Sequence, residues 1–292
     1  DDIMYKCYNI KNFLKFSLIT VFIAVFIFSA TKIKFIFSSA EYNDDKIFLP
    51  VIMYHSIHEG ASAEYSVTPQ QIESDLKYLK DNGYNSVSAQ QLVDYTYSRG
   101  ELPEKPVMIT LDDGFYNNLF YLLPLLEKYD MNAVVSVVGT YVENDAVKDP
   151  HVPEYSYLTW EDINTMLDSG RFEIGNHTFN MHKSLGERTG CHINKNENPE
   201  EYCNTLNSDI AKLQELIKEN TDTVPIVFAY PFGYTCKESI PVLRENGFAI
   251  TLNCYEKPNY ITRNPECLYG INRYNRSGLY STEEFMLKLF KE

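Results

Sequence analysis

Residues 106–114 read Pro-Val-Met-Ile-Thr-Leu-Asp-Asp-Gly, an apolar run that ends in two carboxylates and a glycine. A short run of this kind, closed by a turn signal, predicts a β-strand of a buried sheet. Similar apolar or β-branched runs lie on both sides of it, at 50–55, 84–88, 132–138, 172–177, 224–230, 248–254 and 269–274. Between most of them, apolar residues recur at three- and four-residue steps typical of helices, over 69–82, 89–98, 116–129, 159–169, 200–219 and 236–246.

This alternation predicts an α/β fold with a parallel sheet and crossover helices. The pattern extends over about 240 residues, a length that fits a closed barrel better than an open sheet. The 292 residues, 44% of them hydrophobic, are enough for one sizeable core. A net charge of −14, with no stripe of lysine or arginine, argues against nucleic acid as a partner.

The first forty residues contain an uncharged apolar run, FSLITVFIAVFIFSAT at 16–31, with lysines before and after it. The run has no polar face, so it does not fit an amphipathic helix of a soluble core, and it predicts export of the chain that follows. We expect a cytoplasmic N-terminus at 1–15, a transmembrane signal-anchor at 16–37, a linker at 38–49 and the exported domain at 50–292. The alternative is a signal peptide cleaved near Ser38-Ser39-Ala40, which would make the protein secreted instead of membrane-anchored.

Export gives the cysteines a meaning, because disulfides form in oxidising compartments. Cys7 precedes the apolar run and is expected to stay reduced. Five cysteines follow the run, at 191, 203, 236, 254 and 267, so one of them must remain unpaired. Cys191–Cys203 and Cys254–Cys267 are the nearest neighbours, although spacing leaves the connectivity open. The first pair would pin a predicted surface loop at 183–199.

Unusual polar residues gather where the predicted strands end. They are Tyr54-His55, Asp112-Asp113-Gly114, Asn176-His177 with His182 beyond it, and Tyr230-Pro231-Phe232-Gly233. Taken singly, each has an ordinary explanation as a turn, a surface histidine or loop material. In an α/β barrel, however, the carboxyl ends of the strands and the loops after them meet at one face. Their joint placement therefore predicts a functional site there.

The chemistry of these residues is that of a hydrolytic metal site. Of two adjacent carboxylates, one can bind a cation while the other stays free as a base. Two imidazoles and one carboxylate leave coordination positions open for water, whose pKa the metal lowers. Five residues along a helix rotate by about 140°, so His177 and His182 do not share a helix face. We place His177 at a strand end and His182 in the following loop, which excludes a metalloprotease helix of the HExxH type.

The TLDDG segment, the His177…His182 pair and the YPFG segment at 230–233 together resemble the first three motifs of the NodB-type polysaccharide deacetylases, carbohydrate esterase family four. The resemblance extends over residues 50–275 and implies a distorted (β/α)7 barrel and a divalent metal, most often zinc. It implies that Asp112 is the catalytic base and that Asp113, His177 and His182 bind the metal. Tyr230, Pro231 and Phe232 would wall the substrate groove and offer a backbone N–H to the oxyanion.

The sequence also departs from the family pattern. The five-residue histidine spacing and the early MYHSI segment look more like the branch that deacetylates poly-β-1,6-N-acetylglucosamine. Ala229 precedes Tyr230-Pro231 where an arginine usually tethers the base, and Arg273 is our candidate for that tether. The late histidine motif that supplies the general acid is absent. His55 is the candidate for this role, and the alternative is that it braces a neighbouring loop.

The expected function is removal of N-acetyl groups from an extracellular amino-sugar polymer, of peptidoglycan or poly-N-acetylglucosamine type, by a metal-dependent hydrolase at 50–292. Two alternatives remain. A glycosidase would need two carboxylates set roughly 5–9 Å apart across the sugar, which adjacent aspartates followed by histidines fit less well. A non-catalytic or weakly active carbohydrate-binding barrel would account for the missing acid.

Overall fold

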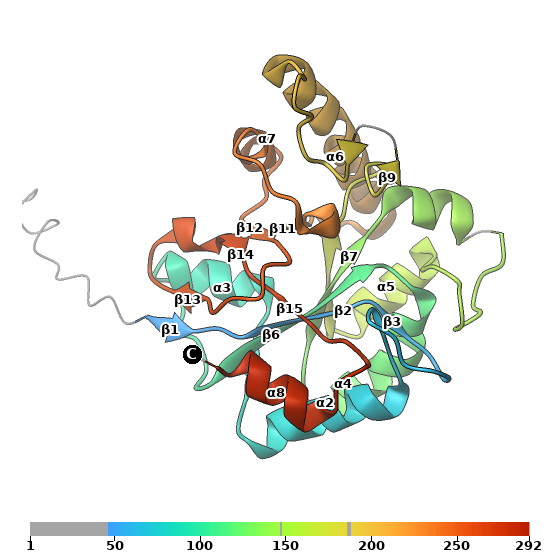
Figure 1. Cartoon of the computed structure of the whole chain (residues 1–292), viewed down its shortest axis with the longest axis vertical. Helices are drawn as coiled ribbons and strands as arrows, with labels where there is room; N and C mark the ends of the chain where they lie inside the picture. Colours follow the sequence, from blue (N-terminus) through green and yellow to red (C-terminus); the bar gives the residue numbers. More distant parts are fainter. Residues whose placement is uncertain (1–45, 147, 186–187, 292) are drawn as a thin grey trace, which may run out of the picture. The chain divides into compact units, whose positions relative to one another are not determined.

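A parallel β-sheet runs through the centre of the protein, whose computed structural model describes residues 46–146, 148–185 and 188–291 (Figure 1). Neighbouring strands in the sheet are parallel throughout. Their order across the sheet is β14 (Tyr269–Ile271), β12 (Ile250–Leu252), β11 (Val227–Ala229), β8 (Phe172–Asn176), β7 (Ala133–Val137), β6 (Pro106–Asp113), β2 (Val51–Tyr54) and β15 (Tyr274–Asn275). The short strand β5 (Asn85–Ser86) pairs with the beginning of β6. The predicted α/β class with a parallel sheet is therefore confirmed.

The two edges of the sheet meet at one short segment. Strands β14 and β15 lie at opposite ends of the strand order, yet only Asn272 and Arg273 separate them in the chain. The first pairs with β12 and the second with β2. The sheet is thus a half-barrel whose edges are joined at residues 272–273, which we call the seam. Counted as one interrupted strand, β14 and β15 bring the strands of this path to seven.

Helices follow the strands as the sequence pattern predicts. They are α2 (Pro69–Asp81), α3 (Ala89–Thr96), α4 (Leu123–Tyr129) after a π-helical turn η1 (Asn118–Leu122), α5 (Trp160–Asp168), α6 (Pro199–Thr221), α7 (Ser239–Glu245) and α8 (Thr282–Leu289). Side-chain caps fix several of the starts: Thr68, Ser88 and Thr159 each accept a hydrogen bond from the backbone N–H three residues on. Helix α8 was not among the predicted helices. It lies beside α2 along one side of the sheet (Figure 1).

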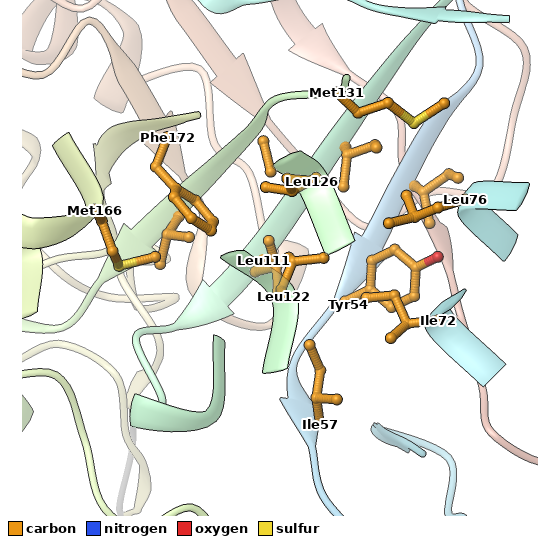
Figure 2. Packing of buried hydrophobic residues seen from close by; sticks show 14 of the residues in the cluster. Tyr54, Ile57, Ile72, Leu76, Leu111, Leu122, Leu126, Met131, Met166 and Phe172 are labelled. Atoms are coloured by element: carbon orange, nitrogen blue, oxygen red, sulfur yellow. The ribbon is translucent and has the colours of Figure 1, made fainter. Parts of the chain in front are cut away.

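Alternation along the strands sorts side chains to the two faces of the sheet. Ile109 and Leu111 of β6 belong to the outer cluster, where Ile72 and Leu76 of α2 and Leu122 of η1 also lie (Figure 2). Met108 belongs to a second cluster on the inner face. By the same two-residue period, Thr110 and Asp112 point inward, and both are buried. The strand that forms the outer core therefore also places a carboxylate inside the half-barrel.

The cysteines do not pair as their spacing along the chain suggested. The five described cysteines are all unpaired, so the Cys191–Cys203 and Cys254–Cys267 disulfides are not formed in the structure. Within the predicted loop at 183–199 lies a small antiparallel hairpin of β9 (Ser184–Leu185) and β10 (Arg188–Thr189).

The predicted membrane segment at 16–37 lies outside the described residues, and none of the helices in the described part is long and apolar enough to cross a membrane.

A buried ion pair fastens the segment after the seam to the first helix. Arg276 donates from Nε to Asp75 Oδ2 over 2.6 Å, and both side chains are fully buried. The hydroxyls of Tyr54 and Thr282 donate to the same carboxylate, over 2.9 and 2.7 Å. Strand β2, helix α2 and the start of α8 therefore share one polar centre. Because a buried charge without its partner is costly, this centre is expected to matter for stability.

Asp75→Asn should lower the free energy of unfolding by about 3–5 kcal/mol, since it leaves the Arg276 guanidinium buried without a counter-charge. Denaturant unfolding of the purified chain measures the change. Glu73→Gln is the matched control: Glu73 lies on the same helix as Asp75, but its ion pair with Lys128 of α4 is exposed, so its loss should leave the unfolding midpoint almost unchanged. Equal effects of the two substitutions would contradict this role of the buried pair.

Candidate functional site

The carboxyl ends of the strands open into a pocket of about 850 Å³. Six of the residues singled out from the sequence line it, namely His55, Asp112, Asp113, His177, His182 and Phe232. They come from the ends of β2, β6 and β8 and from the loops after β8 and β11. The structure thus brings together side chains from four separate parts of the chain, as the placement at strand ends predicts.

Three of these side chains offer ligand atoms to one point. Atoms of Asp113, His177 and His182 lie within 4.8 Å of one another. Nε2 of His182 is 3.2 Å and Nε2 of His177 is 3.8 Å from Oδ1 of Asp113. The ring centres of the two histidines are 4.9 Å apart. Two nitrogens and a carboxylate oxygen that converge in this way are a donor set suited to a divalent metal.

The two imidazoles are held from behind. Nδ1–H of His177 donates to the carbonyl of Ala229 over 2.7 Å, which leaves the lone pair of Nε2 facing Asp113. Burial lowers the pKa of His177 to about 3, so this ring is neutral. Nδ1 of His182 lies 3.2 Å from the hydroxyl of Tyr141. Neutral, oriented imidazoles are the form in which histidine binds metals.

Asp113 shows that the cluster is incomplete without a cation. Its Oδ1 is buried and has no hydrogen-bond partner among the described residues. Burial, together with the nearby charge of Asp112, raises the pKa of Asp113 to about 6. A cation at the point shared with the histidines would satisfy this oxygen and offset its charge. The residues therefore fit a divalent metal.

Asp112 has the opposite environment. Burial alone would raise the pKa of Asp112, but the charge and hydrogen bonds of the Arg273 guanidinium outweigh it and hold the pKa well below its usual range. Arg273 donates from Nη1 and Nη2 to the two oxygens of Asp112, each over 2.7 Å. Its Nε donates to the carbonyl of Asn253 over 2.9 Å. The arginine at the seam thus keeps Asp112 ionised and fixed, next to the three converging ligands.

His55 lies at the end of β2 and faces the same pocket. Its ring packs edge-on against Tyr65, with ring centres 5.1 Å apart. Nδ1 of His55 is buried and lacks a hydrogen-bond partner among the described residues. Behind it, Asn118 donates to the backbone carbonyl of His55 over 2.8 Å, and Asn117 accepts from the N–H of Ile57 over 3.0 Å. The π-helical turn η1 therefore sets the position of the His55 backbone.

Of the segment Tyr230–Phe232, which was expected to wall the substrate groove and to offer a backbone N–H, only Phe232 lines the pocket. The Tyr230 side chain is buried, and its hydroxyl hydrogen-bonds Ser239 over 2.6 Å, away from the pocket. Pro231 is buried as well. The N–H of Tyr230 donates to Leu252, and Pro231 has none, so Phe232 is the residue of the three whose N–H can serve the site. The Phe232 ring lines the pocket over His182, with ring centres 4.6 Å apart.

Aromatic side chains surround the mouth of the pocket. Tyr65, Phe232, Tyr234 and Tyr280 line it and are between 42% and 54% exposed. Rings with open faces beside a polar centre are suited to stacking against sugar rings. Among these, the sequence analysis had named only Phe232.

Tyr141 is another residue of the site that was not predicted from the sequence. It contacts His182, as described above, and its own ring stacks on Tyr157 at a centre distance of 4.4 Å. The residue lies four positions after the end of β7. The rule that functional residues follow strand ends, applied to this strand as well, would have pointed to it.

The chain is similar to known proteins. Residues 99–251, more than half of the 292, match the family model described as polysaccharide deacetylase. The poly-beta-1,6-N-acetyl-D-glucosamine N-deacetylase of Escherichia coli K12 is 26% identical in an alignment of length 217, which covers 68% of this chain but only 32% of that protein. The enzyme of the same name from Staphylococcus aureus MRSA252 is 24% identical over 213 residues, which cover 72% of this chain and 68% of its own length.

A solved structure shows a related fold. The de-N-acetylase from Aggregatibacter actinomycetemcomitans matches with a TM-score of 0.69 and 25% sequence identity, over 84% of this chain and 100% of that chain. With the family model spanning more than half of the sequence, the chain belongs to the polysaccharide deacetylase family, a family of hydrolases.

Proposed function

We propose that this chain is a metal-dependent N-deacetylase that acts on an extracellular polymer of N-acetylated amino sugars. The observation that carries the proposal is the pair of adjacent aspartates with different surroundings. Asp113 shares one point with two histidines, while Asp112 is held ionised by Arg273 beside it. This gives a metal ligand and a free base in one pocket, which is what hydrolysis of an acetamide requires.

Asp113, His177 and His182 would hold the metal, and zinc is the ion that two imidazoles and a carboxylate fit best. When bound, it would supply Lewis acidity, which polarises a carbonyl oxygen and lowers the pKa of water. Asp112 would then take a proton from the attacking water. A carboxylate of such low pKa is a weak base, so it needs an acidified water, and the ligand cluster beside it meets that need.

The remaining steps use residues on the other walls of the pocket. The N–H of Phe232 is our candidate for stabilising the tetrahedral oxyanion, because a fixed backbone donor costs no reorganisation when charge develops. His55, at the carboxyl end of β2, is our candidate for protonating the leaving amine. Arg273 positions Asp112 and touches no substrate in this scheme. The products are acetate and a free amino sugar.

Poly-β-1,6-N-acetylglucosamine is the polymer we favour, because proteins named as its N-deacetylases are among the relatives. The open aromatic rim suits a chain of sugar rings better than an isolated small molecule. We also propose that the segment at 16–37 anchors the domain at the outer face of the membrane. Acetate release measured on this polymer, on peptidoglycan and on chitin oligomers would choose among the substrates.

A glycosidase and a non-catalytic binding protein are the two competing functions. Both oxygens of Asp112 accept from Arg273, and Asp113 belongs to the ligand cluster. Neither is placed as the separate acid that glycoside cleavage uses. Release of acetate without new reducing ends would favour deacetylation, whereas polymer binding without either product would favour the binding protein.

The purified chain should bind about one divalent ion, and His177→Ala or Asp113→Ala should abolish binding, since two donors hold zinc too weakly against a chelator. Elemental analysis after dialysis against a chelator measures this. His192→Ala is the control, because His192 hydrogen-bonds a backbone carbonyl outside the cluster. Stoichiometric metal in both ligand variants would refute the assigned site.

Asp112→Asn should retain metal and lose acetate release by roughly 10²–10⁴-fold, the usual contribution of a positioned base. It should also lower the thermal stability, because Arg273 then lacks its buried counter-charge. Metal content and rate are to be measured on the same preparation. Loss of metal equal to that of Asp113→Ala would mean that the two aspartates have exchanged roles.

His55→Ala should reduce the rate while metal content and substrate affinity stay the same, if His55 donates the proton to the amine. The fall of activity on the basic side of the pH–rate profile should then weaken or disappear. His58→Ala is the control, because His58 bonds Ser66 and does not line the pocket. An unchanged profile with near-normal turnover would leave His55 as a brace for the loop.

A further inference from the structure

The loop that carries the two histidine ligands has an unfavourable backbone. Thr178, directly after His177, has φ +70° and is fully buried. A β-branched residue in this left-handed region is a genuine outlier and costs free energy. Such a conformation persists only where surrounding contacts hold it, so the contacts of the loop decide the direction in which His182 points.

One carboxylate provides the main contacts on the helix side of the loop. Asp209 of α6 accepts from the N–H of Phe179 over 2.7 Å and from the N–H of Asn180 over 2.9 Å. These two residues lie between His177 and His182. Both oxygens of Asp209 are used, and each takes a backbone donor of the loop. Hydrogen bonds to a charged acceptor are the stronger kind.

The same helix also holds the residue before the first ligand. Asn176 donates to the carbonyl of Ile210 and to the side chain of Gln214, over 3.2 and 3.3 Å. Its own Oδ1 accepts from the N–H of Thr178 over 2.8 Å. Helix α6 therefore hydrogen-bonds the loop at two places, once just before His177 and once between His177 and His182.

Backbone hydrogen bonds from the end of β7 hold the opposite side of the loop. The N–H groups of Gly139 and Thr140 donate to the carbonyls of Thr178 and Phe179, over 3.0 and 2.8 Å. A Cβ added at Gly139 would lie 2.3 Å from the Phe179 ring, so the loop is packed against the end of β7 without spare room. The loop thus lies between the end of β7 and helix α6, and the hydrogen bonds of Asp209 set its distance from the helix.

We infer that Asp209 is a positioning residue of the metal site: through the N–H groups of Phe179 and Asn180 it fixes the loop that aims His182 at Asp113. The inference rests on the proposed metal-binding role of Asp113, His177 and His182. Asp209 touches neither ligand nor substrate, and its effect is carried by the backbone. Residues that orient metal ligands from behind contribute substantially to affinity, and their loss typically costs 10–100-fold.

The structure offers a matched control. Glu173 of β8 also accepts from two backbone N–H groups, those of Ala89 and Gln90, over 2.6 and 3.2 Å. It caps the start of α3, at the end of β8 opposite to His177. Glu173→Gln therefore removes the same kind of double cap without touching the histidine loop.

The experiment measures Co²⁺ and Zn²⁺ affinity of the purified chain by competition with a chelator, together with the visible spectrum of bound Co²⁺. Asp209→Asn should weaken both affinities by about 10–100-fold and change the Co²⁺ bands. Asp209→Glu keeps the charge but displaces it by one methylene, and it should cause a smaller loss. Glu173→Gln should lower the thermal unfolding temperature to a similar degree and leave metal affinity within twofold.

Parent-like affinity and spectrum in the Asp209 variants would overturn the inference. So would an equal loss of affinity in Glu173→Gln, because the effect would then follow from general destabilisation. If the Asp209 variants fail to fold while Glu173→Gln folds, Asp209 serves the fold and the inference is again overturned. A parent chain that binds no metal would instead refute the proposed function.

Discussion

The buried pair of Asp112 and Arg273 is the interaction on which the arrangement of the site depends. Asp112 points into the half-barrel from β6, where a lone carboxylate would be protonated or would destabilise the fold. Arg273 lies at the seam, where the two edges of the sheet come together, and both of its outer nitrogens bind Asp112. Its Nε reaches the carbonyl after β12. One guanidinium thus links the seam to β6 and β12, keeps Asp112 charged and fixes its direction.

Two neighbouring residues of the same type acquire different chemistry from their surroundings. Burial and the nearby negative charge of Asp112 raise the pKa of Asp113 to about 6. Asp112 is buried at least as deeply, yet the Arg273 guanidinium holds its pKa well below the usual range. Pairs of titratable groups whose pKa values are pushed apart mark the division between acid–base and binding roles. Here the two pKa values differ because the Arg273 guanidinium hydrogen-bonds both oxygens of Asp112, whereas among the described residues no arginine hydrogen-bonds Asp113.

Most of the strands and helices, and six site residues, could be predicted from the sequence, because local periodicity and strand ends are local properties. Arg273 could be proposed as the partner of Asp112 only through the family resemblance, since 161 residues separate the two in the chain. The Tyr230 side chain faces the core, where Ser239 offers its hydroxyl a partner, and no local pattern reveals such a partner. The same holds for Asn118 behind His55 and for Asp209 behind the histidine loop. Spacing along the chain left the cysteine pairing open, because it does not set the distance between sulfur atoms, and the five described cysteines are all unpaired.

The seam constrains the order in which the protein can fold during its synthesis. During synthesis, Asp112 leaves the ribosome 161 residues ahead of Arg273. Until the later residue arrives, β2 and β12 are unpaired sheet edges, which other chains can join. Formation of long-range contacts of this kind is slow, because the loop between them must be closed first. A chain interrupted before residue 273 would therefore combine open edges with an uncompensated carboxylate, a state that proteases and chaperones recognise as unfinished. Formation of the site therefore waits for the completion of folding, when the seam closes.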